Sequence, residues 1–179
     1  YLFVFVSNLN IKAMNSDNKQ INPLASSGSC GTSLTFSIQS NTLTIEGNGI
    51  MNNYQYISVN NINTPWFSHH QLIKSVVIQS GATSIGSCAF YYFEVLTSIS
   101  IPNTVTSIGE EAFRMCELLS SIELPNSVSC IESGAFVRCD SLLSLIVPEK
   151  VVQIPDSFVY ACLKLLSVTL LGQVISIDR

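Results

Sequence analysis

Six cysteines are the side chains of this chain best suited to chemistry, as nucleophiles, metal ligands or halves of disulfides. None is spaced C-x-x-C, so the patterns of small zinc sites and thioredoxin-like redox sites are absent. Cys116, Cys139 and Cys162 recur every 23 residues. Stacked at strand spacing, their Cα atoms would lie about 5 Å apart, within disulfide range. Three in a column leave one unpaired, and parallel side chains suit packing better.

The cysteine column is therefore predicted to be a buried thiol ladder, with one disulfide or a metal site as the alternatives. Cys88 and Cys130 lie at other positions of the repeat and do not extend the column. The sequence leaves the disulfide state open for all six cysteines: Cys30, Cys88, Cys116, Cys130, Cys139 and Cys162.

The other candidate groups favour structure over catalysis. His69 and His70 are adjacent, and neighbours in sequence rarely point at one metal ion, so a solvated turn is expected. The Glu110–Glu111 pair does not recur in the other repeats and suggests solvation rather than a catalytic dyad. "GNGIMN" lacks the third glycine of a phosphate-binding loop, and no G-x-S-x-G motif occurs. We predict no enzyme and no catalytic, metal or cofactor site.

Composition excludes two further classes of partner. The net charge is −4 and the basic residues are scattered, whereas nucleic-acid binding needs clustered lysine and arginine. Charged residues make up only 11% of the chain, under half of the usual quarter, so most apolar side chains must be hidden. No apolar run approaches the roughly 20 residues that cross a bilayer, so no membrane span is expected.

A 23-residue repeat positions these residues. Four strong columns are Ile85, Ile108, Ile131, Ile154; Leu96, Leu119, Leu142, Leu165; Ile99, Ile122, Leu145, Val168; and Val105, Val128, Val151, Val174. The I-x-I piece suits a short strand, and it is closed by Pro102, Pro125 and Pro148 in three units and by Leu171 in the fourth. Each A-F-x-x-C-x-x-L piece spaces apolar residues three and four apart, which suits a short helical turn. One unit cannot bury this set alone, but stacked units can, so the repeat predicts a solenoid.

The strand Leu96-x-x-Ile99-x-Ile101 and its copies match the L-x-x-L-x-L strand of leucine-rich repeats, although Pro-x-x-Val replaces the usual continuation. The full unit resembles the BspA-type leucine-rich repeat, over roughly residues 64–179. That family is known from surface antigens of mucosa-associated bacteria and parasitic protists. The resemblance implies a leucine-rich-repeat solenoid, mostly short parallel strands with short helical turns, preceded by a small β-hairpin N-terminal cap.

Three segments are expected. Residues 1–28 form an N-terminal segment, either the remnant of a signal peptide or an edge strand or disordered end. Residues 29–71 form a β-hairpin capping region, with Trp66 as a core anchor rather than a ligand-stacking ring. Residues 72–179 form the repeats, the last one incomplete. In the last full unit, "IPDSFVYAC" shifts the phenylalanine to Phe158, which predicts a local rearrangement.

The remaining candidate for function is the exposed face of the strands. Residues that alternate with the buried positions should line one sheet, the surface that solenoids use for partners. The candidate face comprises Val77, Ser98, Ser100, Ser121, Glu123, Ser144, Ile146, Ser167 and Thr169. We predict a non-enzymatic module that binds a protein or glycan. The resemblance implies an adhesin or antigen, at the cell surface or secreted, with host extracellular matrix or another cell as its partner. A cytoplasmic or structural interaction scaffold is the alternative.

Overall fold

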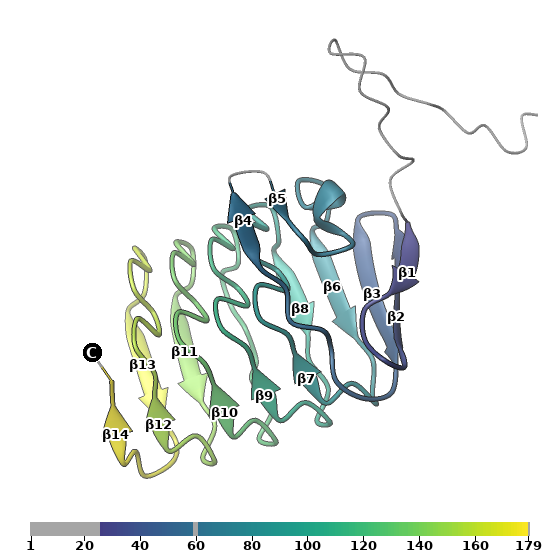
Figure 1. Cartoon of the computed structure of the whole chain (residues 1–179). Helices are drawn as coiled ribbons and strands as arrows, with labels where there is room; N and C mark the ends of the chain where they lie inside the picture. The colour runs from purple at the N-terminus through teal and green to yellow at the C-terminus, as the bar shows by residue number, and fades with distance from the viewer. Residues whose placement is uncertain (1–25, 59–60, 179) are drawn as a thin grey trace, which may run out of the picture.

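The computed structural model describes residues 26–58 and 61–178. Figure 1 shows a row of coils stacked side by side, from β1 to β14. Most coils contribute one strand to each of two faces, here called sheet A and sheet B, with apolar side chains between them. The alternatives for residues 1–28 concern a segment of which residues 1–25 lie outside the described part of the chain.

The N-terminal cap is a hairpin joined to the first coil. Strand β1 (Ser27–Ser29) pairs antiparallel with β2 (Leu34–Gln39), which pairs antiparallel with β3 (Thr42–Gly47). Ser40 and Asn41 make the turn with φ of 46° and 68°, the left-handed conformation of a two-residue hairpin loop. Strand β3 then pairs in parallel with β6 (Ser75–Ile78), so the hairpin becomes the first strands of sheet A. The hairpin expected from the alternating apolar residues is confirmed.

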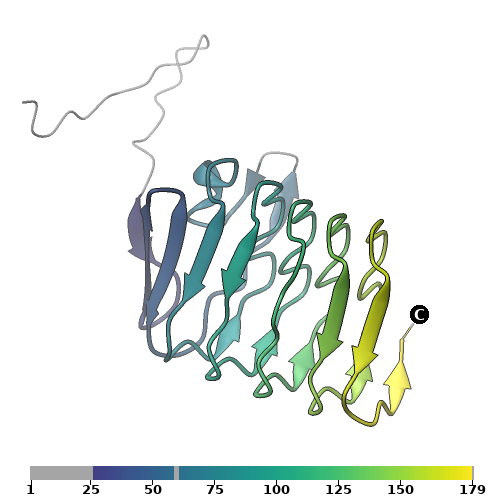
Figure 2. The same cartoon turned by 180° about the vertical axis from the view of Figure 1, so that it is seen from behind.

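Sheet A continues with one strand position per coil. Strand β8 (Ser98–Ser100) pairs with β6, and β11 (Ser144–Val147) pairs with β13 (Ser167–Leu170). All pairs are parallel, and each residue opposes the one 23 positions further on, as Ser75 opposes Ser98. Between β8 and β11, the corresponding coil runs through Ser121–Glu123 without forming a strand, as Figure 2 shows.

Sheet B is built from two-residue strands. Strands β7 (Ser84–Ile85), β9 (Ser107–Ile108) and β10 (Cys130–Ile131) form one parallel group. Strands β12 (Gln153–Ile154) and β14 (Ser176–Ile177) form another. A hairpin of β4 (Tyr56–Ser58) and β5 (Asn61–Ile62) precedes the 3-10 helix η1 (Phe67–His69), the only helix among the described residues.

Proline decides where the parallel ladders end. Leu171 N–H donates to the Val147 carbonyl at 3.1 Å, a bond that proline at the same repeat position cannot make. In sheet B, the N–H groups of Gly109 and Glu132 each donate to the preceding coil at 2.9 Å. Pro155 stands at the next such position, and sheet B is interrupted there, between β10 and β12.

The A-F-x-x-C segments form tight turns rather than the expected helical turns. Two residues in each turn are left-handed, as at Cys88 (φ 52°) and Tyr92 (φ 69°), and the pattern recurs at 23-residue intervals. Left-handed residues cannot continue an α-helix. The Cys88 N–H instead donates to the Glu110 carbonyl of the next coil at 2.8 Å, and the Tyr92 N–H donates to Arg114. The turn segments therefore form backbone hydrogen bonds from one coil to the next, along the solenoid axis, as the strands of the sheets also do.

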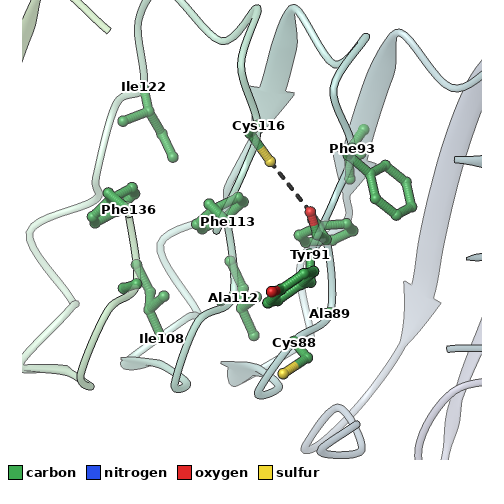
Figure 3. Close-up of a cluster of buried hydrophobic side chains, with 14 of the residues drawn as sticks. Cys88, Ala89, Tyr91, Phe93, Ile108, Ala112, Phe113, Cys116, Ile122 and Phe136 are labelled. Atoms are coloured by element: carbon green, nitrogen blue, oxygen red, sulfur yellow. Dashed lines mark hydrogen bonds between the residues drawn. The ribbon is translucent and has the colours of Figure 1, made fainter. Parts of the chain in front are cut away.

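The core is a ladder of stacked rings and aliphatic side chains. Phe90 stacks on Phe113 with ring centroids 5.4 Å apart, and Phe113 on Phe136 at 5.5 Å, as Figure 3 shows for the last two. Phe158 breaks the stack by meeting Phe136 edge-on, at 81°, which confirms the rearrangement expected in the last full unit. Trp66 begins the ladder. It is fully buried and stacks on Phe90, so its prediction as a core anchor is confirmed.

Candidate functional site

The cysteine column lies inside the solenoid, beside the phenylalanine ladder. Cys116 and Cys139 are fully buried, Cys162 is half-buried, and all six cysteines of the chain are free thiols. Each thiol of the column donates to the carbonyl of a phenylalanine in the preceding coil. The Sγ–O distances are 3.2 Å for Cys116 to Phe90, 3.3 Å for Cys139 to Phe113 and 3.0 Å for Cys162 to Phe136. Figure 3 shows the first of these bonds. The structure therefore has the thiol ladder and not the disulfide.

Burial makes the two fully buried thiols of the column, Cys116 and Cys139, poor nucleophiles, whereas a hydrogen bond from the Cys139 thiol lowers the pKa of Cys162. The apolar surroundings raise the pKa of Cys116, because an ionised sulfur there would lose its water. Burial likewise raises the pKa of Cys30 to about 12 and that of Cys88 to about 11. Because the thiolate is the nucleophile, a raised pKa lowers the reactivity of these thiols at neutral pH. Among residues 26–58 and 61–178, no three histidine, cysteine or acidic side chains are grouped so that they could hold a metal.

The histidines differ from the solvated turn expected of them. His69 is buried in η1, and burial lowers its pKa. The ring of His70 lies flat on Phe67, with centroids 4.3 Å apart, and its Nδ1 lies 2.6 Å from the Phe67 carbonyl. The His70 ring also lies beside Tyr92 and Phe93, with ring centroids 6.3 and 6.4 Å away, so it packs against the first coil.

The Glu110–Glu111 pair is divided between different contacts. Glu111 forms an ion pair with Arg114 at 2.9 Å, while the Glu110 side chain is exposed. The Arg114 guanidinium also lies 5.7 Å from the ring centre of Tyr91. The two carboxylates therefore do not converge on a common site.

Sheet A presents the predicted binding residues to solvent. Eight of the nine are exposed, and Val77 is half-buried. They form two columns across the coils, in register with the strand pairing. The serine column comprises Ser98, Ser121, Ser144 and Ser167, and the variable column comprises Val77, Ser100, Glu123, Ile146 and Thr169. Glu123 is the single charged residue in either column.

A groove opens in sheet A where the strand is missing. It has a volume of about 360 Å³. Its lining is Thr97, Ser98, Ile99, Ser100, Ile101, Ser121, Ile122 and Glu123. The groove therefore brings together four predicted residues, namely Ser98, Ser100, Ser121 and Glu123. The other five lie elsewhere on the sheet: Val77, Ser144, Ile146, Ser167 and Thr169.

Sequence reasoning missed the isoleucine floor of this groove. Ile99 and Ile101 are half-buried, whereas their equivalents in the preceding coil, Val76 and Ile78, are almost fully buried. Both coils have β-branched apolar residues at these alternate positions, so no clear signal in the sequence distinguishes them. The difference arises from the missing strand pairing, which leaves the side chains below it uncovered.

Among the described residues, no helix is long and apolar enough to cross a bilayer.

Comparison with known proteins identifies the repeat. A family profile described as "BspA type Leucine rich repeat region" matches residues 60–179 in six copies. No curated protein matches the chain significantly.

Solved structures share the fold. A leucine-rich repeat protein from Eubacterium ventriosum is 24% identical, with a TM-score of 0.71, over 86% of this chain and 40% of its own. A leucine-rich cell surface protein from Faecalibacterium prausnitzii is 29% identical, with a TM-score of 0.60, over 83% of this chain and 44% of its own. A leucine-rich repeat protein from T. pallidum is 22% identical, with a TM-score of 0.52, over 80% of this chain and 82% of its own. The chain thus spans less than half of the first two proteins.

Proposed function

Because the chain belongs to the BspA-type leucine-rich repeat family, we propose that it is a non-enzymatic module that binds a protein or glycan through sheet A. The observation that carries this proposal is the exposed, hydroxyl-rich face that crosses the coils and includes the groove. Serine hydroxyls supply adaptable hydrogen bonds with little energy each. The variable column then provides selectivity, because its side chains differ from coil to coil.

We further propose a surface or secreted location and a role in adhesion, with host extracellular matrix or another cell as the partner. The support is the likeness to the F. prausnitzii protein, which is described as a cell surface protein, together with the family resemblance.

A second candidate is an interaction scaffold inside the cell. The observation that favours it is the set of six free thiols, because reduced cysteines are usual in the cytosol and disulfides are usual outside it. Titration of thiols in protein isolated from its natural source separates the two candidates. Six reactive thiols after denaturation favour the scaffold, whereas fewer than six indicate oxidation and an extracellular location.

Attachment to immobilised matrix glycoproteins tests the adhesive role. Ser100→Arg and Ser144→Arg place long charged side chains on sheet A, and we expect each to reduce attachment at least severalfold. Ser129→Arg, an exposed position on the sheet B side, is the matched control and should attach like the wild type. Enzymatic removal of glycans from the matrix distinguishes a glycan partner from a protein one. If the wild type attaches no better than an unrelated protein of equal net charge, the adhesive proposal is wrong.

A further inference from the structure

The groove in sheet A has unpaired backbone along it. The N–H groups of Ser121, Ile122, Glu123 and Leu124 donate to no backbone carbonyl within the described residues. On either side, β6 and β8 form a complete parallel pair, and so do β11 and β13. The last bond before the gap is the Leu143 N–H to the Ser120 carbonyl, at 3.2 Å. The middle of the sheet is therefore not closed by main-chain bonds, and the groove opens there.

The floor and rim of the groove differ in chemistry. The floor is aliphatic, with Ile99 and Ile101 half-buried and Ile122 at 8% exposure, while the rim carries serine and threonine hydroxyls. No aromatic ring lines the groove, so a sugar would find no stacking surface there. An aliphatic side chain of a peptide, in contrast, would cover isoleucine surface that the missing strand pairing leaves wet.

The charge of the groove determines which kind of partner it favours. Glu123 is the single ionisable side chain in the lining of the groove. It is exposed and takes part in neither of the two ion pairs found among the described residues. A partner that brings a cation to the rim would therefore meet a free carboxylate, whereas an acidic partner would be repelled.

We propose that this groove binds an extended segment of a protein partner carrying a lysine or arginine side chain beside Glu123. The inference rests on the proposed binding function of sheet A and names the partner's chemistry. The hydroxyls of the rim, from Thr97, Ser98, Ser100 and Ser121, bond to the partner's main chain. An aliphatic side chain covers the isoleucine floor, and the cation pairs with Glu123. The isoleucine floor and the hydroxyl rim supply affinity, and the Glu123 carboxylate supplies selectivity.

A peptide titration of the full chain tests the proposal. The probe is a heptapeptide of alternating lysine and valine, acetylated and amidated at its ends, added to ¹⁵N-labelled protein. We expect saturable amide shifts confined to Ser98–Ser100 and Ser121–Leu124. Glu123→Gln should weaken binding about threefold to fivefold at low salt, which is the scale of an exposed ion pair. This difference should vanish at high salt. Glu46→Gln is the matched control, since Glu46 is exposed at the far end of sheet A on β3.

The outcomes separate this inference from the proposed function. Equal binding by Glu123→Gln and the wild type, or by a peptide with glutamate in place of lysine, overturns the cationic assignment. Shifts centred on Ser144 and Thr169 would overturn the groove while leaving sheet A as a binding face. Matrix attachment without any peptide binding would do the same.

Hydrogen exchange in the free protein tests the groove itself. The amides of Ser121 and Glu123 should exchange at least tenfold faster than those of Leu145 and Val147, because the former have no main-chain acceptor. Equal protection would mean that Ser121–Glu123 forms main-chain hydrogen bonds with its neighbours, and the proposed groove would be wrong.

Discussion

At the scale of single residues, the cysteines of the column serve to fill space in the core between coils. Each thiol lies among apolar side chains and donates to a phenylalanine carbonyl one coil back, so it fills space and uses its weak donor. Buried cysteines of this kind behave as small apolar residues whose ionisation is suppressed. The column contributes to stability through close packing between coils.

Cys139→Ser should destabilise the protein by about 1–3 kcal/mol, because it places a more polar hydroxyl at a fully buried position among apolar side chains. Urea denaturation under reducing conditions measures the change. Cys130→Ser is the control, since Cys130 is exposed and its replacement should change the free energy of unfolding by less than about 0.5 kcal/mol. Equal effects of the two substitutions would argue against a buried column.

The buried thiols also predict a loss of stability at alkaline pH. Burial raises the pKa of Cys30 to about 12, from an ordinary value of 9.0 in the unfolded chain. The stabilisation is complete below pH 9 and is lost as pH rises toward 12, because only the unfolded chain releases the proton in that window.

Denaturation with urea at pH 8, 9 and 10 should therefore show a falling free energy of unfolding. Cys30→Val removes the titrating group and should show a shallower fall, while the tyrosine and lysine titrations stay common to both proteins. The same slope in the two proteins would contradict the assignment to Cys30.

At the scale of elements, the backbone hydrogen-bonding groups of the turn segments and of the cap are oriented in one consistent direction along the solenoid axis. In each turn, N–H groups point to the next coil and carbonyls point to the preceding one, as in the bond from Phe90 N–H to the Ala112 carbonyl. The first coil therefore offers carbonyls toward the cap. The cap supplies the missing donors with the Tyr54 N–H, which meets the Ser87 carbonyl at 2.9 Å, and the Trp66 indole, which meets the Ala89 carbonyl at 2.8 Å. Trp66 thus does in the cap what a backbone N–H does in a coil.

Trp66→Phe should destabilise the protein by about 2–3 kcal/mol, because it leaves the buried Ala89 carbonyl without this donor and also opens space in the core. Circular dichroism is the suitable readout, since the substitution removes the single tryptophan and its fluorescence. Tyr92→Phe is the control, because Tyr92 is a half-buried ring whose hydroxyl has no hydrogen-bond partner among the described residues. An effect of Trp66→Phe no larger than that of the control would show that the indole bond is dispensable.

At the scale of the whole molecule, burial is uneven along the solenoid axis. The cap and the middle coils enclose the fully buried rings, while half of the sixteen exposed large apolar side chains lie between Tyr160 and Ile177. In repeat proteins each coil is stabilised mainly by its neighbours, so unevenness of this kind should appear as uneven local stability.

Amide hydrogen exchange of the 179-residue chain should therefore show a gradient. The amides of β13 and β14, whose side chains are all exposed, should exchange faster than those of β2, β3 and β11, whose alternate side chains are buried. Uniform protection along the axis would contradict this expectation and would indicate that the array unfolds as a single unit.

The sequence alone determined the repeat and, through it, most of the architecture. The 23-residue columns predicted parallel stacking, the buried positions such as Ile85, Ile108 and Ile131, and the exposed columns of sheet A, because each repeat position fixes which side of the coil a residue occupies. The sequence also located Trp66 in the core and the irregularity at Phe158. It predicted helical turns wrongly, since apolar spacing of three and four suits a tight turn as well as a helix.

Only the tertiary structure decided which hydrogen bonds the coils make with each other. A left-handed turn becomes favourable when its N–H groups find carbonyls in the next coil, and no single repeat contains that information. The interruption of sheet A was likewise decided by contacts between coils. Ser121–Glu123 carries the same pattern as its neighbours, yet it lacks their bonds and leaves Ile99 and Ile101 half-exposed. The candidate face could be read from alternation, whereas the groove depends on distances between coils, which the pattern within one coil does not set.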